Sequence, residues 1–112
     1  MNRIDPDTEA AVRRFLDLIS SRYEVEAAIL YGSYARGTHH DESDVDIAVL
    51  LRSEHQRFLV VKLDMVSIAV KVMLDTDVLI SPLPIWLDEW ENPESHSNPA
   101  LLHNINREGI RL

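Results

Sequence analysis

The chain has 112 residues and a mass of 12.8 kDa, enough for one hydrophobic core, so we expect a single domain over residues 1–112. It contains no cysteine, which excludes a disulfide scaffold, a thiolate metal site and a cysteine nucleophile. Its 11 Lys and Arg against 19 Asp and Glu give a net charge of −8, which disfavours nucleic-acid binding and suits a basic partner or bound cations.

The N-terminal third predicts a helix followed by a strand. The first residues are polar and acidic, without the features of a signal or transit peptide, so we expect a cytoplasmic protein. Asp5 and Pro6 are typical of an N-cap and a first helical position, and apolar residues recur at helical spacing up to Ile19. Residues Val25–Tyr31 form an apolar run that ends at Gly32, which predicts a strand and then a tight turn.

The middle of the chain predicts a second strand and a long helix. Asp44–Leu51 becomes apolar on both faces, which is typical of a central strand covered on both sides. Ser53 and Gln56 have the spacing of a capping box, and the apolar run Phe58–Leu74 follows them. Alternation at residues 66, 68, 70 and 72 also fits a strand, but the cap and the length favour a helix, and its charges rule against a membrane span.

The last third predicts a strand, a short helical turn and a final helix. Thr76–Leu83 is expected as a third strand, and the two prolines that bound it indicate either an edge position or a strand end. A helical turn is expected at Leu87–Glu91, and Asn98 with Pro99 starts a helix over residues 100–107 that Gly109 ends in a left-handed conformation. This order of elements predicts a small mixed α/β domain with helices covering the sheet.

The segment between the first two strands carries residue types that bind phosphate. Gly32 allows a tight turn and close approach of a ligand, and Ser33 is placed to cap a short helix whose free N–H groups attract an anion. Arg36 follows about one helical turn later, where its guanidinium can bind the same anion. Gly37 then ends the turn. The pattern predicts a phosphate site here.

Asp44 and Asp46 lie two residues apart at the start of a strand, so both side chains leave the same face. Such carboxylates repel each other unless a cation lies between them, and oxygen ligands favour Mg²⁺. A phosphate site beside one or two Mg²⁺ ions is what nucleotidyl transfer needs. The alternative, an ordinary turn followed by a solvated strand start, is disfavoured by the joint spacing of the motif.

Three other features have both a structural and a functional interpretation. His39 and His40 are expected in a polar loop rather than in a metal site, because no third ligand has matching spacing. Trp86 and Trp90 either anchor to the core or form a partner surface. The apolar excess of residues 57–74 is explained by burial under the sheet or by partner contact, and burial is favoured.

The pair Gly32–Ser33, followed after ten residues by Asp44 and Asp46, resembles the signature of the DNA polymerase β-type nucleotidyltransferases. The longer string GSYARG followed by SDVDIAV is similar to their minimal nucleotidyltransferase branch, MNT. The resemblance implies that Gly32 and Ser33 hold ATP and that Asp44 and Asp46 bind Mg²⁺. Many members of this branch are antitoxins paired with a HEPN ribonuclease toxin, and some transfer AMP to a toxin tyrosine.

The resemblance also implies a third carboxylate on a later strand, where it helps to bind metal and to activate the acceptor hydroxyl. Asp77 is our choice over Asp75, because it lies inside the predicted third strand. If the aligned position is Ser81 instead, the base is missing and activity is weak or absent.

We therefore expect a Mg²⁺-dependent antitoxin that transfers AMP from ATP to a hydroxyl of a cognate HEPN toxin, as part of a homo- or hetero-oligomer without a membrane or nucleic-acid partner. Two alternatives stay open. One is an antitoxin that occludes the toxin without catalysis. The other is a small-molecule nucleotidyltransferase of the antibiotic-modifying kind, completed by dimerisation.

Overall fold

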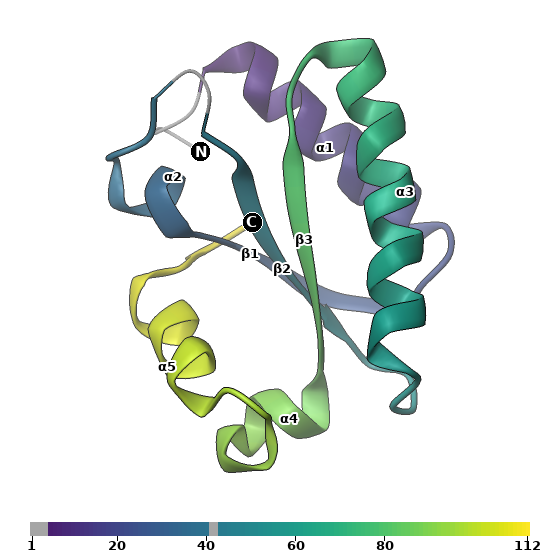
Figure 1. The fold of residues 1–112 in the computed structure, drawn as a ribbon, viewed down its shortest axis with the longest axis vertical. Helices are drawn as coiled ribbons and strands as arrows, with labels where there is room; N and C mark the ends of the chain where they lie inside the picture. Colours follow the sequence, from purple (N-terminus) through teal and green to yellow (C-terminus); the bar gives the residue numbers. More distant parts are fainter. Residues whose placement is uncertain (1–4, 41–42) are drawn as a thin grey trace.

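A four-stranded mixed sheet forms the centre of the computed structural model, which describes residues 5–40 and 43–112 (Figure 1). Residues 41–42 of the predicted loop and the first four residues lie outside the described part. The strand order is β3-β2-β1-β4. β1 pairs antiparallel with β2 and β4, and β3 pairs parallel with β2. The strands are β1 (Val25–Tyr31), β2 (Val45–Leu51), β3 (Ile80–Trp86) and β4 (Ile110–Arg111).

Helices cover both faces of this sheet, as the sequence predicts. They are α1 (Pro6–Ser20), α2 (Gly32–Arg36), α3 (Phe58–Thr76), α4 (Leu87–Glu91) and α5 (Pro99–Glu108), with a 3₁₀ turn, η1 (Pro93–Ser95). In β2, Ile47 and Val49 face the cluster formed with α1 and α3, whereas Ala48 and Leu50 face the cluster formed with α5. The central strand is therefore buried on both sides.

The helix starts predicted from proline are confirmed. The Asp5 side chain accepts a hydrogen bond from the Thr8 N–H at 2.7 Å and caps α1. Asn98 accepts one from the Leu101 N–H at 3.2 Å and caps α5. Each cap satisfies an N–H group that has no partner within its helix.

The predicted capping box before α3 and the predicted third strand are wrong. α3 begins at Phe58 without a side-chain cap, so Ser53 and Gln56 form no capping box. It then continues to Thr76, whose hydroxyl donates to the Val72 carbonyl at 2.6 Å. β3 consequently starts at Ile80 rather than Thr76 and runs through both prolines to Trp86, which is possible because β3 lies at the sheet edge.

The C-terminal glycine has a different role from the predicted one. Gly109 has φ −70° and ψ 154°, an extended conformation rather than a left-handed stop. A Cβ atom there would lie 2.4 Å from both the Ile105 carbonyl oxygen and the Ile29 Cγ2. Glycine thus lets the chain pass close to α5 and β1 and continue into β4, a strand that the sequence did not predict.

The two tryptophans belong to the core. Trp86 is fully buried beneath α1 and α3, and Trp90 packs against the cluster on the α5 side. None of the helices in the described part of the chain is long and apolar enough to cross a membrane.

Candidate active site

The start of α2 lies directly against a carboxylate of β2. Gly32 has a φ of +72°, and a Cβ atom at this position would meet Asp46 Oδ2 at 2.3 Å. Tyr31, the preceding residue, is the register partner of Asp46. Both the positive φ and the close contact require glycine. The strand pairing of β1 and β2 therefore brings the predicted phosphate segment and the predicted metal-binding segment together.

Asp44 and Asp46 influence each other electrostatically. Burial raises the pKa of Asp46, the negative charge of Asp44 raises it further, and the Arg36 guanidinium lowers it. Asp46 is half-buried in β2, and Asp44 is exposed one residue before the strand. Two carboxylates so arranged are stabilised by a cation between them, and their oxygen donors fit Mg²⁺ completed by phosphate and water.

Asp46 has a polar neighbour on each adjoining strand. Tyr31 is its partner on β1, and Ser81 is its partner on β3. Burial, together with the charge of Asp46, raises the pKa of Tyr31 to about 12, so this phenol stays protonated at neutral pH. Sequence reasoning did not single out Tyr31, because only the pairing of β1 with β2 places it beside the carboxylate.

Asp77 lies outside β3, so its predicted place in a strand is wrong. It is the C-cap of α3 and has a φ of 62°. The position that adjoins Asp46 on the neighbouring strand is Ser81. Within residues 5–40 and 43–112, no group of three or more His, Cys, Asp and Glu side chains is arranged to hold a metal ion.

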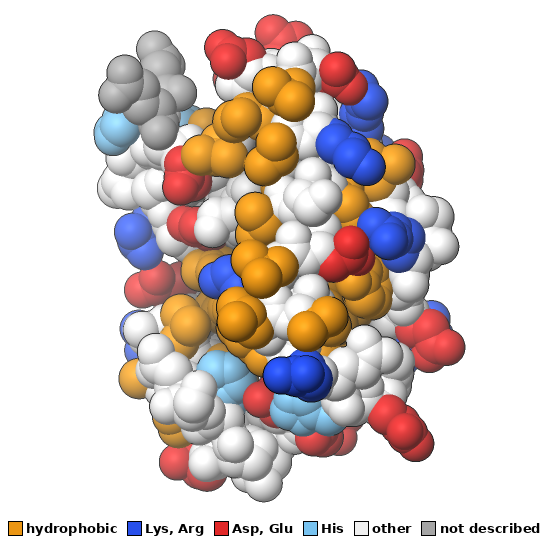
Figure 2. Space-filling model, turned by 45° about the vertical axis from the view of Figure 1, so that its right-hand side comes forward, with side chains coloured by type: hydrophobic (Ala, Val, Ile, Leu, Met, Phe, Trp, Pro, Cys, Tyr) orange, Lys and Arg blue, Asp and Glu red, His pale blue; other side chains and the backbone are white. Residues whose placement is uncertain are grey.

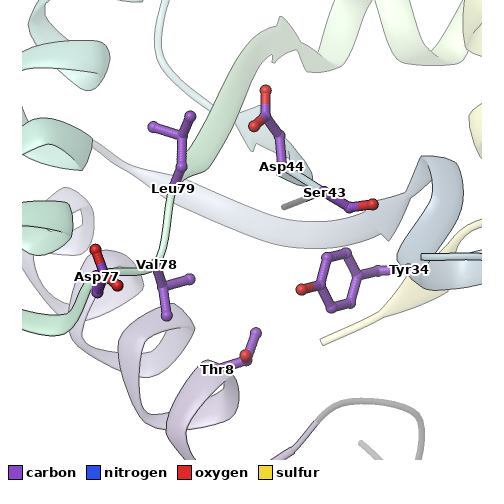
Figure 3. Close-up of a pocket in the computed structure, with 7 residues that line it drawn as sticks. All are labelled: Thr8, Tyr34, Ser43, Asp44, Asp77, Val78 and Leu79. Carbon is purple, nitrogen blue, oxygen red and sulfur yellow. The ribbon is translucent and has the colours of Figure 1, made fainter. Parts of the chain in front are cut away.

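Asp77 nevertheless shares a cavity with Asp44. This cavity has a volume of about 280 Å³ and is lined by Thr8, Tyr34, Ser43, Asp44, Asp77, Val78 and Leu79 (Figure 3). The two carboxylates lie on different sides of it, and the Tyr34 hydroxyl points into it (Figure 3). The ring of Tyr34 stacks on His39 with 3.9 Å between centroids. Sequence reasoning missed Thr8 and Tyr34, because helical periodicity marks both positions as ordinary core.

Arg36 and Gly32 line a second cavity, of about 200 Å³, together with Tyr31 and residues 101, 104, 105 and 108 of α5. There Arg36 Nη1 lies 3.6 Å from Glu108 Oε2. The predicted residues are therefore divided: Asp44 and Asp77 line the first cavity, Gly32 and Arg36 line the second, and Ser33 and Asp46 are among the lining residues of neither. No local sequence signal connects α5 with this region, because the contact depends on how α5 packs.

The short helix α2 differs in one detail from the prediction. Ser33 lies inside the helix, and the N-cap is Tyr31, which makes no side-chain capping bond. The prediction that Gly37 ends the turn is confirmed, since Gly37 is the C-cap with a left-handed φ of 74°. Thr38 N–H then donates to the Ser33 carbonyl at 2.9 Å, which closes the turn.

The nucleotidyltransferase domain family matches residues 12–95, a range that includes Gly32, Ser33, Asp44 and Asp46. The chain therefore belongs to this family of enzymes.

Among similar proteins are relatives from Methanocaldococcus jannaschii that carry the name "putative protein adenylyltransferase". One is 37% identical over 76 residues, which cover 62% of this chain and 75% of the relative. Another is 41% identical over 44 residues, which cover 38% of this chain and 44% of the relative.

Solved structures share the fold at lower identity. A crystal structure of the toxin–antitoxin MntA–HpeT has a TM-score of 0.59 and 22% identity, covering 93% of this chain and 70% of that chain. A toxin–antitoxin structure with AMP-PNP has the same TM-score of 0.59 and 23% identity, covering 92% of this chain and 70% of that chain.

Proposed function

We propose that this chain is an antitoxin that transfers AMP from ATP to a hydroxyl of a partner toxin, with a HEPN toxin tyrosine as the acceptor. The observation that carries this proposal is the contact of Gly32 with Asp46, which joins the phosphate segment to the carboxylate pair. The names of the relatives support protein adenylylation. The toxin–antitoxin neighbours, one of them with AMP-PNP, support a toxin partner and a nucleotide substrate.

In this reaction the acceptor oxygen attacks the α-phosphorus of ATP. The bond to the β,γ-pyrophosphate breaks, pyrophosphate leaves, and the hydroxyl proton passes to a base or to water. Asp44 and Asp46 are the proposed ligands of one or two Mg²⁺ ions, which when bound neutralise charge on the phosphates. Gly32 and Ser33 are the proposed nucleotide-binding pair.

Arg36 and Asp77 have subsidiary places in the proposal. Arg36 is exposed and paired with Glu108, a weak surface contact that a phosphate can replace. Asp77 lines the cavity of Asp44 from the far side, so we assign it to the acceptor hydroxyl. The role of Asp77 as a third metal ligand, which the resemblance implies, stays a prediction.

The direct test is mass spectrometry of the partner protein after incubation with this chain, ATP and Mg²⁺. We expect one or more added adenylate masses with the wild-type chain and none with Asp44→Asn or Asp46→Asn. Asp17→Asn is the matched control, because Asp17 is an exposed carboxylate on α1. An unmodified partner in the presence of folded wild-type chain contradicts the proposal.

Ser81 favours a second candidate function, neutralisation by occlusion. It occupies the strand position beside Asp46, where the resemblance implies a third carboxylate. Without that group, transfer is slow or absent and the antitoxin acts by covering the toxin. Toxin neutralisation in cells by the double variant Asp44→Ala with Asp46→Ala separates the two functions: retention supports occlusion, and loss supports catalysis.

A further inference from the structure

The two cavities near the carboxylate pair differ in charge. The first cavity is lined by the carboxylates of Asp44 and Asp77, which repel a polyphosphate. The second cavity is lined by one guanidinium, from Arg36, and one carboxylate, from Glu108, so these two charges cancel. Gly32, which belongs to the proposed nucleotide-binding pair, also lines the second cavity. The second cavity is therefore the better place for a nucleotide.

The walls of the second cavity suit a nucleoside. Tyr31, Leu101 and Ile105 supply an aromatic ring and aliphatic side chains, against which a flat base can pack. Asn104 adds a side-chain amide, which can hydrogen-bond to the edge of a base. The cavity volume of about 200 Å³ is below the range of about 300–1,000 Å³ that is typical of pockets for whole drug-sized ligands. The cavity thus fits the nucleoside part of ATP rather than all of it.

The residues of α5 that line the second cavity follow one side of the helix away from Arg36. Leu101, Asn104 and Glu108 are three and four residues apart, which places them on one face of α5. Glu108 is the one that contacts Arg36. Leu101 lies about 10 Å farther along the helix axis, at the helical rise per residue. A nucleotide with its phosphates at Gly32 and Arg36 can therefore extend along α5, with its base near Asn104 and Leu101.

A contact within α5 orients the side chain of Asn104. Arg107 Nη2 donates a hydrogen bond to Asn104 Oδ1 at 2.7 Å. The amide nitrogen is then left to donate, and the second lone pair of the carbonyl oxygen is left to accept. An asparagine amide matches adenine, because the adenine amine donates and a ring nitrogen beside it accepts. Guanine has a carbonyl oxygen in place of this amine, so the same amide matches it less well.

Most of the exposed large hydrophobic side chains lie away from the second cavity. Six of the nine in the described part of the chain belong to α3. They gather on the side of the molecule that is turned forward in Figure 2. Since α3 packs on the face of the sheet opposite to α5, this surface is separate from the second cavity. A molecule that covers α3 would leave the cavity accessible to a nucleotide.

We propose that the second cavity binds the nucleoside part of ATP, with the base against Tyr31 and Leu101 and its edge hydrogen-bonded to Asn104. This inference rests on the proposed function, because it takes the phosphates to be held at Gly32 and Arg36. It adds to that function a preference for adenine over guanine and the residue that determines it. The nucleoside then leaves the first cavity free for the acceptor hydroxyl.

The first test is nucleotide binding without the partner protein, measured by calorimetry in the presence of Mg²⁺. The wild type should bind ATP more tightly than GTP and more tightly than inorganic tripolyphosphate. Asn104→Ala should weaken ATP binding about threefold to tenfold, as expected for one lost hydrogen bond, and should reduce the preference for ATP over GTP. Asn106→Ala is the matched control, because it makes the same change at an exposed position of α5 that does not line this cavity.

The second test fills the cavity. Leu101→Trp should displace the base, and so weaken ATP binding while tripolyphosphate binding stays close to that of the wild type. Leu112→Trp is the matched control, because Leu112 is an exposed leucine that does not line the second cavity. Far-UV circular dichroism verifies that each variant is folded.

The outcomes separate this inference from the proposed function. The inference is overturned by a wild type that binds ATP, GTP and tripolyphosphate equally, by Asn104→Ala binding that equals Asn106→Ala binding, or by a loss of tripolyphosphate binding in Leu101→Trp as large as the loss of ATP binding. If the partner protein still receives adenylate in such a case, the proposed function stands without the inference. The expected binding pattern without adenylate on the partner supports the inference and contradicts the proposed function. A folded wild type that binds no nucleotide overturns both.

Discussion

Gly32 and Gly37 have nearly the same left-handed backbone but different surroundings. Their φ angles are +72° and +74°, yet a Cβ atom at Gly32 meets Asp46 Oδ2 at 2.3 Å, and one at Gly37 meets nothing within 4 Å. The sequence predicts that both positions turn the chain. It does not predict the contact with Asp46, because that contact depends on pairing between β1 and β2.

This difference gives a prediction with an internal control. Replacing either glycine by alanine should lower the free energy of unfolding by about 1 kcal/mol through backbone strain. Only Gly32→Ala should also displace the Asp46 carboxylate and weaken Mg²⁺ and ATP binding, measured by calorimetry. Equal binding by both variants would contradict the role assigned to the close contact.

Tyr23 connects the end of α1 with α3. Its hydroxyl donates a hydrogen bond to Asp64 Oδ2 at 2.5 Å, and burial followed by this bond raises the tyrosine pKa to about 12. This folded-state pKa exceeds the ordinary value of 10.0. The protonated Tyr23 hydroxyl therefore stabilises the fold below pH 10, and this stabilisation is lost as the pH rises toward about 12. Denaturation midpoints measured across this interval should fall in the wild type.

The variant Tyr23→Phe should show a smaller fall over the same interval. Part of the fall should persist, because Tyr31 also has a pKa raised to about 12. A wild type and a variant with the same alkaline dependence would show that Tyr23 ionises as freely in the folded chain as in the unfolded chain.

At the scale of elements, the sequence predicts most of the helices and strands but misplaces the boundary between α3 and β3. The bounds of β1 and the α3 start agree with the predictions from apolar patterning. The α3 C-terminus does not, because Thr76, Asp77 and Val78 have no local pattern that separates helix from strand. Asp77 therefore belongs to a helix cap, and Ser81 takes the register position beside Asp46.

The junction of α5 and β4 shows how close packing determines an element that patterning does not reveal. Gly109→Ala would place a methyl group 2.4 Å from Ile105 O and Ile29 Cγ2. We expect it to lower the free energy of unfolding by about 1–3 kcal/mol through overpacking. Denaturant titration measures the loss, and hydrogen exchange at Leu112, whose N–H donates to the Ala28 carbonyl at 2.9 Å, should increase.

At the scale of the whole molecule, two apolar clusters share one sheet. Residues of β1 and β2 alternate between the clusters, so neither can separate without loss of the central strands. The sequence predicts helices on both faces of the sheet. It does not predict which helix shares a cavity with which carboxylate, because that depends on contacts between distant segments.

The two tryptophans make this coupling measurable. Trp86 belongs to the cluster under α1 and α3, and Trp90 packs against the cluster under α5. In Trp90→Phe, fluorescence reports the first cluster, and in Trp86→Phe it reports the second. In each variant we expect the fluorescence and circular dichroism transitions to coincide. Separate midpoints within one variant would show that the clusters unfold independently.

The prolines in β3 restrict how the molecule can associate with other chains. β3 is an edge strand, and neither Pro82 nor Pro84 has an amide hydrogen to offer to an incoming strand. The opposite rim is only two residues long, at β4. Addition of an extended peptide, or stacking of sheets into fibrils, is disfavoured at both rims.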